Sequence, residues 1–157
     1  NMRGHQAKIK KVQPDTKFNS PVVAQFINYL MIDGKKTIAE KIVYSAMSKL
    51  AEKTKLGELE AFMKALENVR PKIELRSRRV GGANYQVPVP VTESRQLSLA
   101  MRWILKAAKE GRGGKDSIES LTNQLFSAFN KEGSAYKKRE EVHKMAEANK
   151  AFSHLNW

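Results

Sequence analysis

The residues best suited to chemistry lie close together in residues 70–85, RPKIELRSRRVGGANY. This segment contributes four arginines, one lysine and one tyrosine as candidate contacts: Arg70, Lys72, Arg76, Arg78, Arg79 and Tyr85. A guanidinium group presents paired N–H donors that match phosphate oxygens, and a tyrosine ring can stack on an unpaired base. The alternative is that the charges only protect an edge strand from aggregation, for which one or two are sufficient. The segment therefore predicts contact with RNA or DNA.

Basic residues are gathered in three segments rather than spread along the chain. The 157 residues include 29 Lys and Arg against 16 Asp and Glu, which gives a net charge of +13. Residues 1–17, 70–82 and 102–115 each hold five basic residues and one acidic residue, so the rest of the chain is nearly neutral. Such clusters are typical of segments that contact a polyanion.

Two of the basic features have simpler explanations that stay open. The first 17 residues have too little apolar content to order themselves, and they either form a flexible tail or order along a phosphate backbone. Lys35 and Lys36 lie at a turn before a predicted helix, where two ammonium groups and a helix N-terminus favour an anion; a lysine pair for solubility is the alternative. The mixed charges of residues 137–144, KKREEVHK, indicate a solvated helix face.

The sequence contains no pattern that indicates an enzyme. It has no cysteine, which excludes disulfides, thiolate zinc sites, iron–sulfur clusters and a cysteine nucleophile. The three histidines, at positions 5, 143 and 154, share no metal-ligand spacing, and no Walker-type or nucleophile-elbow motif occurs. We therefore expect no catalysis, no cofactor and no metal.

The length predicts one domain, with residues 1–17 as a basic arm and residues 18–157 as a single helical domain. No apolar run approaches the ~18 residues of a membrane span, and the first 17 residues lack the apolar centre of a signal peptide. We expect a soluble basic protein with no membrane partner.

The elements that position the basic segments follow from hydrophobic periodicity. Apolar residues at helical spacing predict six helices, over residues 21–34, 37–53, 57–69, 92–111, 116–133 and 134–152. Ser20 before Pro21 is a predicted cap, and Thr37 with Glu40 and Asp116 with Glu119 are predicted capping boxes. Ile38 is expected on the buried face of the second helix. Ion pairs between residues 137 and 141 and between residues 140 and 144 are expected along the sixth.

Between the third and fourth helices the period changes from 3.6 to 2. Residues 72–80 and 83–91 alternate apolar and polar side chains, and Gly81-Gly82 supplies the positive φ angles of a two-residue turn. Pro88 and Pro90 cannot donate ladder hydrogen bonds, which predicts that the second strand is an edge strand or leaves the ladder there. A lone hairpin is marginally stable, so we expect it to project from a helical body that supports it.

Four blocks of this chain resemble the family of small-subunit ribosomal protein seven, of the bacterial and organellar type. They are residues 26–46 (FINYLMIDGKKTIAEKIVYSA), 67–89 (ENVRPKIELRSRRVGGANYQVPV), 99–108 (LAMRWILKAA) and 137–154 (KKREEVHKMAEANKAFSH). The resemblance implies a bundle of six helices with a protruding two-stranded antiparallel hairpin between the third and fourth. It implies RNA-binding residues at Arg3, Lys8, Lys10, Lys11, Lys35, Lys36, Arg70, Lys72, Arg76, Arg78, Arg79, Tyr85, Arg95, Arg102, Lys109, Arg112 and Lys115.

The resemblance also implies a role and partners. Members of this family bind the 3′ major domain of small-subunit ribosomal RNA first and nucleate assembly of the head. Their hairpin lies near the exit-site tRNA and the mRNA path, with small-subunit protein eleven as a neighbour. The compartment would be the bacterial cytoplasm or the interior of a mitochondrion or plastid.

Two other classes of protein remain as alternatives. A basic DNA-architectural protein could place an arginine hairpin in a minor groove, but this chain has no dimer signature and no wedge residue at the hairpin tip. A basic protein of the membrane surface is a weaker alternative, because the apolar faces of all six helices are needed for one another.

Overall fold

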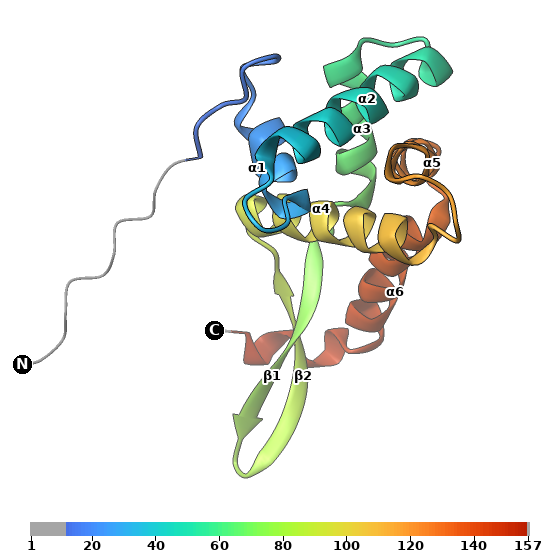
Figure 1. The fold of residues 1–157 in the computed structure, drawn as a ribbon. Helices are drawn as coiled ribbons and strands as arrows, with labels where there is room; N and C mark the ends of the chain where they lie inside the picture. Colours follow the sequence, from blue (N-terminus) through green and yellow to red (C-terminus); the bar gives the residue numbers. More distant parts are fainter. Residues whose placement is uncertain (1–11, 157) are drawn as a thin grey trace, which may run out of the picture.

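The computed structural model describes residues 12–156 and shows a mainly helical protein with one hairpin (Figure 1). The described elements, in chain order, are α1 (Pro21–Leu30), α2 (Lys36–Thr54), α3 (Glu58–Val69), β1 (Ile73–Val80), β2 (Ala83–Pro90), α4 (Glu93–Glu110), α5 (Ser117–Phe129), α6 (Gly133–Ala148) and the 3-10 helix η1 (Lys150–Leu155). The predicted fold class, six helices with an antiparallel hairpin between the third and fourth, is confirmed. In this part of the chain no helix is long and apolar enough to cross a membrane.

The core lies among the first five α-helices. Phe26 of α1 and Phe62 of α3 meet edge to face, with ring centroids 5.1 Å apart. Met47 of α2, Met101 of α4 and Leu125 of α5 are fully buried around them. Burial of apolar side chains at this scale is the main source of stability, because each large side chain removed from water contributes about 1.5–3 kcal/mol. These helices therefore form the rigid body that carries the hairpin.

The predicted hairpin is confirmed residue by residue. Its strands pair antiparallel from Ile73 opposite Pro90 to Val80 opposite Ala83. Gly81 and Gly82 have φ angles of +58° and +83°, which only glycine adopts without strain. Figure 1 shows the hairpin extending from the α4 side of the helical body, away from α1, α2 and α3.

The start of α2 differs from the prediction. The capping box of Thr37 and Glu40 is wrong, because α2 begins one residue earlier, at Lys36, and its cap residue Lys35 makes no side-chain cap bond. Asp33 and Gly34 both have positive φ, and the Lys35 N–H bonds the Ile32 carbonyl at 3.0 Å. This tight turn ends the preceding segment and leaves Lys35 in the cap position. The caps at Ser20 and Asp116 are confirmed, with bonds of 3.2 Å to the Val23 N–H and 2.7 Å to the Glu119 N–H.

Four further details of the helices differ from what the hydrophobic periodicity and charge spacing predict. Helix α1 ends at Leu30, before Gly34, because Met31 is extended. Ile38 lies outside the core, 56% exposed, since α2 turns Ala39 and Val43 inward instead. Helix α6 stops at Ala148 rather than at residue 152, and η1 turns the chain toward the hairpin, where the Phe152 and Tyr85 rings meet at 5.3 Å. Glu140 pairs with its neighbour Arg139 rather than one turn along the helix.

Candidate nucleic-acid interface

Helix α4 carries a stripe of basic side chains along one face. Arg95, Arg102, Lys106 and Lys109 are separated by seven, four and three residues. With 3.6 residues per turn, these separations place all four on the same side of the helix. The opposite side holds the buried Ala100, Met101, Ile104 and Ala107. The amphipathic pattern that anchors α4 in the core therefore also sets the direction of its cations.

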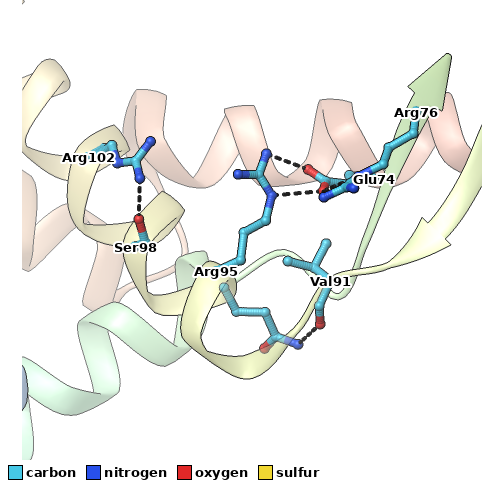
Figure 2. A network of polar contacts seen from close by, with 7 residues as sticks. Glu74, Arg76, Val91, Arg95, Ser98 and Arg102 are labelled. Atoms are coloured by element: carbon cyan, nitrogen blue, oxygen red, sulfur yellow. Dashed lines mark hydrogen bonds and ion pairs between the residues drawn. The ribbon is translucent and has the colours of Figure 1, made fainter. Parts of the chain in front are cut away.

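An ion-pair network joins the first turn of α4 to the base of the hairpin (Figure 2). Arg95 donates from Nε to Glu74 Oε1 at 2.8 Å and from a terminal nitrogen to Oε2 at 3.0 Å. Arg76 reaches the same carboxylate at 3.4 Å. The Glu74 side chain is only 13% exposed, and the hydrogen bonds from Arg95 lower its pKa more than burial raises it. Glu74 is therefore ionised and holds β1 against α4.

Gln96 connects the same region through two further hydrogen bonds. Its amide nitrogen donates to the Val91 carbonyl at 2.9 Å, and its amide oxygen accepts from Arg70 Nε at 3.1 Å. Arg70 also pairs with Glu67 of α3 at 3.0 Å. We call Glu74, Arg76, Arg95 and Gln96, with Arg70, the hairpin brace. Its contacts fix the angle at which the hairpin leaves the helices.

Arg102 is held in one orientation by two groups. Its guanidinium lies over the Tyr29 ring, 5.5 Å from the centroid, and it donates to Ser98 Oγ. The hydroxyls of Tyr29 and Ser98 share a hydrogen bond of 3.0 Å, which together with Gln25 and Arg102 lowers the pKa of Tyr29. An arginine positioned in this way loses less side-chain freedom when it binds a phosphate. The fold therefore orients the Arg102 guanidinium without any ligand.

The far part of the hairpin rests on the C-terminal segment. Arg78 donates to the Leu155 carbonyl, and Tyr85 already packs on Phe152, so its ring has a partner within the chain. Nearer the helices, His143 of α6 accepts a hydrogen bond from the Lys72 N–H at 2.9 Å through Nε2. Burial and the nearby Arg139 lower the pKa of His143, which favours the neutral ring that this bond needs. The C-terminal residues thus support the hairpin from one side.

The remaining predicted contacts are exposed cations at helix ends and in loops. Lys35 and Lys36 are exposed at the start of α2. Lys109, Arg112 and Lys115 are exposed at the end of α4 and in the loop that follows, where Arg112 Nε donates to the Lys115 carbonyl at 2.8 Å. Lys109, Arg112 and Lys115 thus lie at the C-terminal end of α4, whereas Arg79 lies apart, near the hairpin tip. The predicted arm residues lie outside the described part of the chain: Arg3, Lys8, Lys10 and Lys11.

Comparison with known proteins shows which family this basic helical protein with a hairpin resembles. The family model of ribosomal protein S7p/S5e matches residues 2–150. The chain belongs to the ribosomal protein S7p/S5e family. It is 55% identical to the small ribosomal subunit protein uS7 of Thermosipho melanesiensis and 53% identical to those of Thermosipho africanus and Nautilia profundicola. Each match covers 99% of this chain and the whole of the relative.

Several residues that organise the interface of this S7p/S5e protein were missed from its sequence. Glu74 was counted only as one acidic residue in a basic strand, yet it orients two arginines. Ser98 stands three residues after Arg95 and four before Arg102, a helical spacing that could have identified it as a neighbour. The partnership of Tyr29 with Ser98 spans 69 residues, and no local signal indicates it.

The described residues offer no obvious centre for metal chemistry. No group of three or more His, Asp or Glu side chains within residues 12–156 lies close enough to hold a metal ion. The acidic side chains with the clearest roles, Asp15 and Glu74, are engaged in hydrogen bonds and ion pairs of the fold.

Proposed function

We propose that this protein is a structural component of the small ribosomal subunit that binds small-subunit ribosomal RNA, and that it acts without catalysis. The observation that carries this proposal is the α4 stripe, continued by the hairpin. Its arginines are oriented by Glu74, Ser98 and Tyr29 before any RNA arrives. Family membership and full-length similarity to bacterial uS7 proteins support it.

The physical basis of binding is the replacement of counterions on folded RNA. Each Lys or Arg that neutralises a phosphate releases condensed cations, so the affinity falls steeply as salt rises. The major groove of an RNA helix is too deep and narrow for side chains to read. An arginine-bearing hairpin on a rigid body therefore recognises the shape of a junction or groove rather than a sequence of paired bases.

In finer detail, we propose that the protein binds the 3′ major domain first and nucleates assembly of the head. The hairpin would lie near the exit-site tRNA and the mRNA path, beside neighbouring proteins that include small-subunit protein eleven. The resemblance described above supports this placement, and so does a hairpin that extends away from the helical body (Figure 1). The bacterial relatives favour a bacterial ribosome.

A salt-dependent binding titration tests the proposed function. The full chain is titrated with the 3′ major domain of small-subunit ribosomal RNA, with duplex DNA and an unrelated RNA of equal length as competitors. We expect a preference for the ribosomal fragment that persists at high salt. If the competitors displace the fragment equally, the basic surface is nonspecific; if duplex DNA wins, the protein is a DNA-architectural protein and the proposal fails.

A further inference from the structure

A groove lies between the end of α1, the second half of α4 and the start of α5. Its volume is about 440 Å³, which is within the ~300–1,000 Å³ that is common for small-ligand sites. Apolar side chains make up much of its wall, among them Leu30, Ile42, Leu105 and Leu121. Three cations also line it: Lys106, Lys109 and Arg112. The two cations of the α4 stripe nearest its C-terminal end therefore stand beside an apolar recess.

An exposed isoleucine stands at the edge of this groove. Ile32 is 70% exposed, although it is a large apolar residue. The turn formed by Asp33 and Gly34, closed by the 3.0 Å bond from the Lys35 N–H to the Ile32 carbonyl, holds its backbone in place. An apolar side chain displayed on a tight turn next to an apolar groove indicates a contact surface.

The groove wall on the α1 side is also fixed in advance. Tyr29 lines the groove, and its hydroxyl is bonded to Ser98 and to Gln25 at 3.0 and 3.2 Å. The Arg102 guanidinium lies over its ring. The groove thus adjoins the oriented part of the α4 stripe, and the Tyr29 side of its wall needs little reordering when a ligand enters.

The charge of the residues that line the groove indicates what kind of ligand it can bind. Among the described residues that line it, three are basic and none is acidic. A complementary occupant combines an anionic part with an apolar or planar part. An unpaired nucleotide has both, since its base has two apolar faces and its phosphates are negative.

We propose that this groove binds one unpaired nucleotide of the ribosomal RNA. The base lies against Leu30, Ile32 and Leu105, and the adjoining phosphates contact Lys106, Lys109 and Arg112. This inference rests on the proposed function and adds to it a contact that depends on a base rather than on charge alone.

The test compares two exposed isoleucines by the same salt titration with the 3′ major domain RNA. Ile32→Ala removes an apolar contact at the groove, and Ile38→Ala is its matched control, because Ile38 is 56% exposed on α2 and does not line the groove. We expect Ile32→Ala to weaken binding about fivefold with an unchanged slope of log affinity against log salt, because no phosphate contact is lost. Ile38→Ala should bind as the unchanged protein does.

Two results would overturn the inference. Equal affinity of Ile32→Ala and the unchanged protein would show that RNA does not use the groove. Equal losses in both variants would show an effect unrelated to the groove. In either case a preference of the unchanged protein for the ribosomal fragment leaves the proposed function standing, so the two failures are distinguishable.

Discussion

The hairpin brace and the C-terminal half of α4 contain similar cations, but the two regions use them differently. In the brace, Arg95 is bound to Glu74 through two hydrogen bonds. The Glu74 carboxylate partly neutralises its charge, and the pair holds β1 in place. At the other end of α4, Lys109 and Arg112 border an apolar groove that has no acidic residue among its described lining. A count of basic residues therefore does not distinguish side chains that are available to bind phosphate from side chains that hold other parts of the protein in position.

The largest effect is expected from the hairpin that the brace positions. Changing Arg76, Arg78 and Arg79 together to Ala should weaken binding to the 3′ major domain RNA about 100-fold at moderate salt, because phosphate contacts are lost and the contacts of Arg76 with Glu74 and of Arg78 with the Leu155 carbonyl no longer position the hairpin. The titration measures this loss, and far-UV circular dichroism checks that helical content is unchanged. Loss of helical signal would show instead that the hairpin arginines are needed for the fold.

The next largest effect is expected at Glu74, where a substitution distinguishes the positioning of the hairpin from the net charge of the surface. Glu74→Gln removes a negative charge, so charge counting alone predicts tighter RNA binding. We expect weaker binding, because Arg95 and Arg76 lose the carboxylate that orients β1. The free energy of unfolding should also fall by about 1.5 kcal/mol, a value that allows for the partial exposure of Arg95. Chemical denaturation measures it, and tighter binding by the variant would contradict the positioning role.

The same substitution has a defined pH dependence. The folded state lowers the pKa of Glu74, so its contribution to stability is complete above the pKa of an unfolded glutamate and is lost as the pH falls through the lower folded value. The stability difference between the unchanged protein and Glu74→Gln should therefore be largest near neutral pH and shrink below about pH 4. A difference that stays constant into acid would mean that the carboxylate charge is not what stabilises the brace.

A smaller effect is expected at the end of α4. Lys109→Ala should reduce the slope of log affinity against log salt by about one, because one phosphate contact is lost. It should not change the free energy of unfolding, since Lys109 is exposed. Lys144→Ala, an exposed lysine of α6, is the matched control and should change neither quantity. A lower free energy of unfolding in Lys109→Ala would show that this lysine also stabilises the fold, so the C-terminal half of α4 would not differ from the hairpin brace in this respect.

The smallest effect concerns the support of the hairpin by His143. Because the fold lowers the pKa of His143, the bond that its ring accepts from the Lys72 N–H is present above about pH 6.5, the ordinary histidine pKa, and is lost as the pH falls through the folded value. The protection factor of the Lys72 amide in hydrogen exchange should fall as the pH is lowered from 7 through the folded pKa of His143. The Val91 amide, which donates to the Lys72 carbonyl at 3.0 Å, is the control. Equal changes at both amides would point to general loosening of the hairpin.

Some contacts between residues close in sequence were predictable, although the expected capping box of Thr37 and Glu40 did not form. Gly81-Gly82 between two alternating segments determines a tight hairpin, since few other residues adopt its two positive φ angles. Ser20 before Pro21 determines the start of α1 through a bond three residues away. Asp116 does the same for α5. In each case the partners are neighbours in the chain, so backbone geometry alone sets the contact.

Contacts between distant residues were decided only by the tertiary structure. Arg95 follows Glu74 by 21 residues, Ser98 follows Tyr29 by 69, and His143 follows Lys72 by 71. Periodicity shows which side of an element faces inward, but not which neighbour that side meets, because packing of the whole core sets the position of each helix. The sequence alone therefore determined a basic helical protein with an arginine hairpin, and the packing decided which arginines are oriented and where an apolar groove lies beside them.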